Sequence, residues 1–210
     1  MKSILNSMII LAMTAILASC GTSGKTNTEA ENTTTTAPEV TYSVDPAASV
    51  VAWRGEVAGV YGHDGVISIA EGTVTASGNT ITGGKVVIDM TTIQPDNPES
   101  YKDEDGSRAS DLVAHLSTGD FFLTETYPTA TFVIKSQEGN NLIGDLTVRG
   151  ITKEETATIT SMVATPEGLS ANATLVFNRQ DYKVSWVHFM KDMVLSDDIS
   201  LNISISATSL

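Results

Sequence analysis

The side chains best suited to chemistry in this sequence are its three histidines, His63, His115 and His188. They lie far apart in the chain and lack the short spacing of zinc-binding motifs, so structural or surface roles are expected for them. His115 has the best claim to a functional role, because Asp111 precedes it by one helical turn and the pair could bond a polar ligand. The alternative is that Asp111 and His115 only fix their helix.

Two further charged segments could have a function. Arg179 and Asp181 stand two residues apart, as neighbours on one strand face do, and are predicted to form a structural ion pair. The segment 96–106 is rich in oxygen ligands for Ca²⁺, but it lacks the EF-hand pattern and a solvated acidic loop is favoured. The sequence contains no Gly-x-Ser-x-Gly, phosphate-loop or zincin motif. We therefore predict no enzyme, no catalytic residue, no metal and no cofactor.

The elements that must position these residues are almost all β-strands. Apolar and polar residues alternate, as in one-sided strands, at 51–57, 86–90, 130–135, 142–149, 169–178 and 199–207. Gly-rich or Asn-rich segments at 77–79, 83–84, 139–141 and 166–168 are predicted to connect strands as hairpins. About eight strands without alternating helices predict an antiparallel barrel or sandwich.

One short helix interrupts the strand pattern. Leu112 and Leu116 lie four residues apart, on one face of a helix predicted over 111–116. Tyr127-Pro128 then forces an extended backbone, which leads into the next strand.

Several motifs in this region resemble those of the YceI-like lipid- and polyisoprenoid-binding family. They are Asp111-x-x-x-His115-Leu116, Asp120-Phe121-Phe122, the segment from Tyr127 to Phe132, Gly144–Lys153, and Asn178-Arg179-Gln180-Asp181-Tyr182. The resemblance covers residues 41–208. It implies an all-β fold with one short helix, an elongated, lipocalin-like, eight-stranded antiparallel β-barrel with that helix beside the barrel opening.

The resemblance also implies a hollow barrel that holds a polyisoprenoid, isoprenoid quinone or fatty-acyl lipid without catalysis. Periodicity alone does not distinguish a hollow barrel from a packed one. Small inward residues at Ala130, Ala171 and Ala173 would leave room for a lipid tail. The predicted ligand-binding residues of the interior and opening are Val51, Trp53, Val86, Ile88, Met90, Leu112, His115, Leu116, Phe121, Phe122, Phe132, Ile134, Leu146, Val148, Ala173, Leu175 and Phe177.

Two other functions remain open from the sequence. One is a structural or stress-related envelope module with a packed core and no ligand. The other is a hydrolase or Ca²⁺-dependent module that uses His115 or the acidic loop.

The chain departs from the family pattern in three places. Ala48 stands where relatives commonly have His, Lys183 stands where Gly commonly follows Tyr182, and the acidic loop 94–107 is longer than usual. These differences concern the head-group end of the expected ligand more than the fold.

The amino end has the features of a bacterial lipoprotein signal. Leu17-Ala18-Ser19-Cys20 follows an apolar run, which predicts a signal peptide at 1–19 and acyl chains, palmitate among them, on Cys20. The tract that follows Cys20 is polar, which predicts a disordered tether. The lipidated cysteine and its tether thus span 20–40, and the barrel domain spans 41–210. Because Cys20 is the only cysteine, the exported domain has no disulfide and no thiolate metal site.

Charge and sorting signals complete the prediction. A formal net charge of −13 disfavours nucleic acid as a partner. Gly21 after Cys20 favours sorting to the outer membrane. We expect an extracytoplasmic lipoprotein that is anchored in the outer membrane through Cys20 and faces the periplasm. Its partner is one isoprenoid or fatty-acyl lipid, and a homodimer is compatible with the sequence.

Overall fold

The computed structural model describes residues 37–57, 60–186 and 194–210. The predicted signal peptide, Cys20, most of the predicted tether and His188 lie outside these residues. None of the described helices is long and apolar enough to cross a membrane. The strands are β1 (Glu39–Val44), β2 (Val50–Val57), β3 (Tyr61–Ser77), β4 (Thr80–Pro95), β5 (Thr129–Glu138), β6 (Asn141–Val148), β7 (Ile151–Ala164), β8 (Gly168–Asn178) and β9 (Leu195–Ser209). The helices are α1 (Ala109–Leu116) and the 3-10 helices η1 (Pro98–Ser100) and η2 (Arg179–Tyr182).

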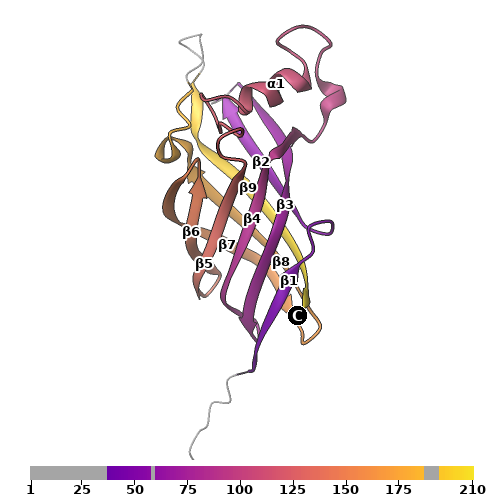
Figure 1. The fold of residues 1–210 in the computed structure, drawn as a ribbon, viewed down its shortest axis with the longest axis vertical. Coiled ribbons are helices and arrows are strands. Elements are labelled where there is room, and N and C mark those ends of the chain that lie inside the picture. Colours follow the sequence, from indigo (N-terminus) through magenta and orange to yellow (C-terminus); the bar gives the residue numbers. More distant parts are fainter. Residues whose placement is uncertain (1–36, 58–59, 187–193) are drawn as a thin grey trace, which may run out of the picture. The chain divides into compact units, whose positions relative to one another are not determined.

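The strands form one closed antiparallel barrel (Figure 1). They follow the order β1-β3-β2-β9-β8-β7-β6-β5-β4, and a further pairing of β3 with β4 closes the ring. β1 and β2 share one position, because both lie between β3 and β9, β1 beside Thr73–Ser77 and β2 beside Tyr61–Ile67 of β3. The barrel therefore has the eight strand positions that the sequence predicts.

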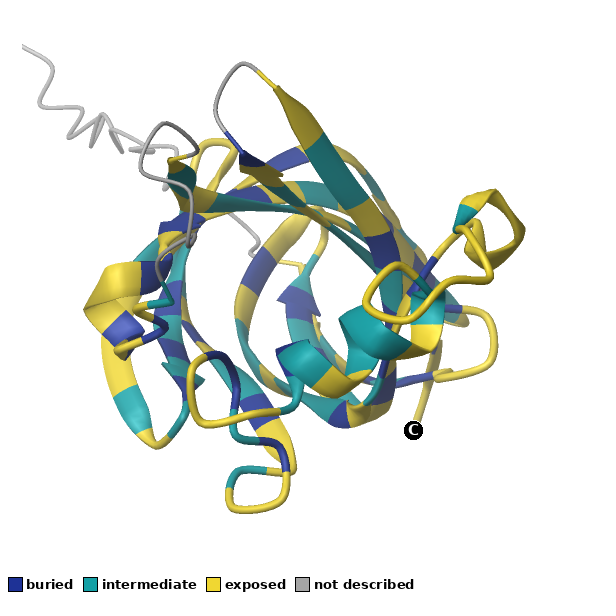
Figure 2. Cartoon of the chain, turned by 90° about the horizontal axis from the view of Figure 1, so that it is seen from above, coloured by how far each residue is buried: buried dark blue, intermediate teal, exposed yellow. Residues whose placement is uncertain are grey.

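The two ends of the barrel differ in what covers them (Figures 1 and 2). α1, the loop that precedes it and η2 lie at one end, which we call the mouth. The short turns between β3 and β4 and between β7 and β8 lie at the other, which we call the far end. The predicted helix is confirmed, and it lies beside the opening of the barrel (Figure 2).

Strand alternation directs apolar side chains into the barrel, as predicted. In β8, the side chains of Leu169, Leu175 and Phe177 are buried, whereas Ser170 and Thr174 are exposed. The pattern follows from the pleat, which points successive side chains to opposite faces.

The prediction that Gly83-Gly84 connects two strands is wrong. Both glycines lie inside β4, where Gly84 pairs with Val74 of β3. Gly84 has a φ of +145°, and a Cβ there would lie 2.4 Å from the carbonyl oxygen of Thr73. Glycine is required here because only glycine tolerates this φ and this close approach of two backbones.

Two large inward side chains of the strands, Trp53 and Phe132, lie against the barrel wall. A Cβ on Gly65 of β3 would lie 2.3 Å from the Trp53 ring, and one on Gly144 of β6 would lie 2.6 Å from the Phe132 ring. The Trp53 indole N–H donates to the Val66 carbonyl at 3.3 Å, which holds the ring along the wall. Because each ring occupies space left by a missing side chain, the interior beside it stays open.

Candidate functional site

The barrel interior contains two cavities. The larger has a volume of about 840 Å³ and reaches the mouth, and the smaller, of about 110 Å³, lies toward the far end. Their walls share Val51, Ile88, Leu146 and Leu201, so the two cavities are neighbours along the interior. The larger volume falls within the range of about 300–1,000 Å³ that is typical of small-molecule sites.

Every residue predicted to bind the ligand from the interior lines one of these cavities, although a role in binding stays a prediction. Strand alternation and the inner face of α1 place them there. Trp53, Met90, Leu112, His115, Leu116, Phe121, Phe122, Val148 and Phe177 line the large cavity, Val86, Phe132, Ile134, Ala173 and Leu175 the small one, and Val51, Ile88 and Leu146 both.

α1 is held at the mouth by its first turn. The Asp111 carboxylate accepts hydrogen bonds from the backbone N–H groups of Arg108, at 3.0 Å, and Gly106, at 2.9 Å. The bond from Arg108, the residue that precedes α1, satisfies a donor that a helix start otherwise leaves unpaired, and the bond from Gly106 ties the preceding loop to the helix. Leu112 and Leu116 then face the cavity, and Leu116 is buried.

The predicted pairing of Asp111 with His115 is wrong, because Asp111 is used by the backbone before the helix. The His115 ring instead packs edge-on against two aromatic rings. Its centroid lies 4.9 Å from that of Phe121 and 5.1 Å from that of Trp186. His115 still lines the large cavity, as one member of an aromatic cluster at the mouth.

The predicted ion pair between Arg179 and Asp181 is also wrong. The chain leaves β8 at Asn178 and continues as the 3-10 helix η2, so the spacing of two no longer places both side chains on one face. The Asn178 side chain accepts from the backbone N–H of Gln180 at 2.8 Å and so caps η2. Arg179 forms its ion pair with Asp197 of β9, at 3.3 Å.

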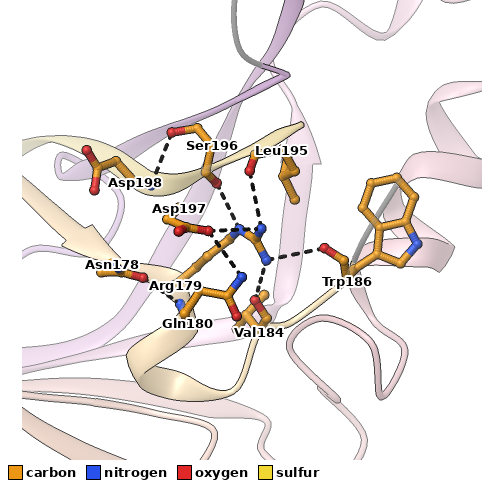
Figure 3. Close-up of polar contacts among 9 residues, drawn as sticks. All are labelled: Asn178, Arg179, Gln180, Val184, Trp186, Leu195, Ser196, Asp197 and Asp198. Atoms are coloured by element: carbon orange, nitrogen blue, oxygen red, sulfur yellow. Dashed lines mark hydrogen bonds and ion pairs between the residues drawn. The ribbon is translucent and has the colours of Figure 1, made fainter. Parts of the chain in front are cut away.

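Arg179 joins two separate stretches of chain in the mouth wall (Figure 3). Its Nε donates to the carbonyl of Ser196 at 2.8 Å, and Nη2 donates to Leu195 at 3.3 Å as well as to Asp197. Nη1 donates to the carbonyls of Val184, at 2.5 Å, and Trp186, at 3.4 Å. All five N–H donors of the guanidinium are therefore engaged. The residue is only 3% exposed, and this burial lowers the pKa of Arg179.

The backbone of Lys183, which follows η2, shows why glycine is common at this position in the family. Lys183 has a φ of 58°, in the left-handed region that favours glycine. The preceding Tyr182 is fully buried, and its hydroxyl donates to the Glu155 carboxylate at 2.8 Å. Burial raises the pKa of Tyr182, and the hydrogen bond to Glu155 adds a smaller increase.

The large cavity also contains a polar pair that is not among the predicted ligand-binding residues. His63 Nδ1 lies 2.8 Å from the hydroxyl of Tyr101, and both side chains line the wall. Desolvation lowers the pKa of His63 and raises that of Tyr101. Alternation in β3 was the available signal, because Tyr61, His63 and Ile67 all point inward.

Two carboxylates of the acidic loop form ion pairs with Arg108, which follows the loop. Arg108 Nε lies 2.8 Å from a carboxylate oxygen of Asp103, and Arg108 Nη1 bonds Asp105. Within residues 37–57, 60–186 and 194–210, no group of three or more His, Cys, Asp or Glu side chains could hold a metal ion.

The closed antiparallel barrel with one helix at its mouth and a hollow interior defines the class of lipocalin-like eight-stranded barrels. The YceI-like domain family matches residues 42–207, so the chain belongs to that family.

Comparison with individual proteins agrees with the fold. BcnA of Burkholderia cenocepacia superposes with a TM-score of 0.55 at 18% identity, covering 79% of this chain and 99% of BcnA. A polyisoprenoid-binding domain from Saccharophagus degradans, implicated in plant cell wall breakdown, superposes with a TM-score of 0.57 at 12% identity, covering 81% and 99%. A UPF0312 protein of Staphylococcus aureus strain USA300 is 52% identical over 42 residues, which are 20% of this chain and 25% of that protein. The match thus spans about a quarter of the curated relatives' length.

Proposed function

We propose that this protein binds one polyisoprenoid, isoprenoid quinone or fatty-acyl lipid in its barrel, for storage or transport and without catalysis. The observation that carries the proposal is the cavity of about 840 Å³, which continues from the mouth toward a second apolar cavity. A long cavity of this kind fits a slender hydrocarbon tail. The related domain from Saccharophagus degradans, described as polyisoprenoid-binding, supports the same class of ligand.

Apolar burial alone is large enough to drive such binding. Each buried CH₂ group contributes about 0.8 kcal/mol. Association costs about 4–15 kcal/mol in lost translational and rotational freedom. A tail of a few isoprene units therefore offsets this cost through contacts with the walls alone.

Native mass spectrometry of the mature protein, purified from its own host, tests the proposal. We expect a mass above that of the lipidated chain, and organic extraction should recover the extra component as an isoprenoid or acyl lipid. A protein that is recovered empty and takes up no added lipid would support the structural envelope module instead.

We further propose that the protein is anchored in the outer membrane through acyl chains on Cys20, with the barrel in the periplasm. Stable anchoring needs two or more chains, so loss of the acceptor thiol should release the protein. Cys20→Ser is expected to leave the membrane fraction, whereas Ser19→Ala keeps a small residue before the cysteine and should sediment as the wild type does. Equal sedimentation of Cys20→Ser and wild type would contradict the anchor.

A further inference from the structure

We propose that His63 and Tyr101 form a head-group site that selects lipids with an uncharged, hydrogen-bonding head over lipids with a carboxylate or phosphate. This inference rests on the proposed function, because it assumes that the tail occupies the cavity behind these two residues.

The pair is fixed in place before any ligand arrives. His63 comes from β3 and Tyr101 from the loop before α1, and their rings stack with centroids 5.8 Å apart and an interplanar angle of 18°. The Tyr61 ring packs edge-on against His63 at 5.4 Å. Together with the 2.8 Å contact between Nδ1 and the hydroxyl, these neighbours hold both polar groups at the cavity wall.

The pair offers one donor and one acceptor to the cavity in either tautomer. If Tyr101 donates to Nδ1, the remaining ring nitrogen of His63 carries a hydrogen and the phenol oxygen accepts. If Nδ1 donates to the phenol oxygen, the phenol hydrogen and the bare Nε2 are available instead. A hydroxyl or carbonyl head can therefore be bonded without a change in the charge of the protein.

The unused donor and acceptor of the pair are accessible from the cavity. In the described part of the chain, the contact between His63 and Tyr101 is the only hydrogen bond of either side chain. Every fully buried side-chain nitrogen or oxygen in the described part of the chain has a hydrogen-bond partner. The His63 Nε2 has no such partner among those residues, so this atom is not fully buried in the wall. Because both residues line the large cavity, a bound head group can reach them.

Both members of the pair are neutral near pH 7. Desolvation lowers the pKa of His63, and the opposing effect of Asp64 is smaller. The Asp64 carboxylate is itself bonded to Arg54 at 2.6 Å. Desolvation raises the pKa of Tyr101, with Asp96 and Asp64 acting in the same direction.

Three cationic side chains line the large cavity, Lys102, Arg108 and Arg179, but the two arginines are already bound by protein groups. All five donors of Arg179 are engaged by protein groups, and Arg108 is held by Asp103 and Asp105. Lys102 is exposed and lies in a loop that carries an excess of carboxylates. Those carboxylates are Asp96, Glu99, Asp103, Glu104 and Asp105, and Asp111 follows in the first turn of α1. Six carboxylates thus face two cations, Lys102 and Arg108, in the segment 96–111. A carboxylate or phosphate head would lose hydration beside this excess of negative charge, whereas an alcohol or carbonyl head would lose less.

Three probes with matched tails test the proposal on the mature protein. Geranylgeraniol carries a hydroxyl head, geranylgeranoic acid carries a carboxylate at pH 7.5, and the corresponding C20 hydrocarbon has no head. Affinities are measured by displacement of a fluorescent apolar reporter from wild type, Tyr101→Phe, His63→Phe and two controls. Tyr127→Phe removes a hydroxyl that makes no hydrogen bond to the described residues and lines neither cavity, and Lys102→Gln removes the nearby cation.

We expect the alcohol to bind more tightly than the acid. Tyr101→Phe and His63→Phe should each weaken the alcohol by about 2- to 12-fold, the effect of one neutral hydrogen bond, and leave the hydrocarbon unchanged. Tyr127→Phe should bind all three probes as wild type does, and Lys102→Gln should not weaken the acid alone.

Three results would overturn the inference: tighter binding of the acid than the alcohol, a loss for the acid alone in Lys102→Gln, or equal losses for alcohol and hydrocarbon in Tyr101→Phe and His63→Phe. In each case the proposed function would still stand, since the tail binds. Failure of all three probes to displace the reporter from wild type would instead remove the proposed function.

Discussion

The two halves of the barrel interior are built from the same strands but differ in volume and chemistry. Toward the far end, only strand residues surround a cavity of about 110 Å³, and most of them are apolar. At the mouth, α1, η2 and two connecting segments add His115, Arg179, Tyr101 and Trp186 to the wall of a cavity of about 840 Å³. The difference indicates that strand alternation makes a place for a tail, whereas discrimination between head groups depends on where the chain leaves its strands.

The largest effect should come from filling the mouth half. Ala130 lines the large cavity, so Ala130→Phe is expected to abolish recovery of bound lipid, measured by native mass spectrometry. Ala173 lines the small cavity, and Ala173→Phe should exclude long tails while short tails still bind. Each change adds overpacking that costs about 1–3 kcal/mol of stability, so thermal melts must show a folded protein.

Ala52→Phe is the matched control for both variants. Ala52 lies between Val51 and Trp53 of β2, whose side chains line the large cavity, so its own side chain points outward. Wild-type lipid content is expected in this variant. Equal lipid content in folded Ala130→Phe would show that the tail does not occupy the mouth half.

Next in size is the loss of the Arg179 contacts at the mouth. Arg179→Lys keeps the charge but replaces a planar fork of five donors by one ammonium group. Buried carbonyls of Val184, Leu195 and Ser196 then compete for fewer donors, so the free energy of unfolding should fall by about 1.5–3 kcal/mol in urea titrations. Gln180→Ala, which removes one exposed bond to Asp197, should change it far less. Equal stabilities of Arg179→Lys and wild type would contradict a bridging role.

A smaller effect is expected from His115→Ala, which separates the two roles that the sequence leaves open. Because the ring packs against Phe121 and Trp186, its loss should lower stability by about 0.5–1.5 kcal/mol. Affinities for geranylgeraniol and the matched hydrocarbon should fall equally, and His115→Phe should restore both. A loss for the alcohol alone, with an unchanged melting temperature, would make His115 a head-group residue.

The smallest effect is a pH dependence that arises from His63. Its pKa in the folded protein lies below the 6.5 of an unfolded chain, because burial disfavours the charged ring. At pH 7.5 the ring is largely neutral in both states, but as the pH falls through 6.5 the unfolded chain binds the proton first and stability is lost. The unfolding free energy should therefore decrease more between pH 7.5 and 5.5 in wild type than in His63→Phe. Parallel curves would show that His63 titrates as an exposed histidine does.

The sequence predicts the barrel where alternation is unbroken and fails where it is interrupted. β3 escaped detection because its register shifts between Val66 and Ser68 and again between Ile69 and Glu71. Its inward residues change from odd numbers, such as Ile67, to even numbers, such as Val74. Such bulges insert an extra residue and break the period of two.

The mouth could be predicted only in part, for a different reason. The helix and its apolar face follow from local spacing, so Leu112 and Leu116 were placed correctly. The contact between His63 and Tyr101 joins residues 38 positions apart, through a loop whose path no local pattern specifies. Arg179 was misassigned because the strand ends one residue earlier, at Asn178.

The Arg179 guanidinium also has a consequence for local unfolding. One side chain bonds carbonyls at 184 and 186 on one stretch of chain and at 195 and 196 on another. Neither stretch can separate from the wall without breaking bonds that the other shares, so the two should open cooperatively, as one unit with a common free energy. In native-state hydrogen exchange, the protected amides of both stretches would then share one opening reaction, distinct from the global unfolding that exposes the strands of the far end.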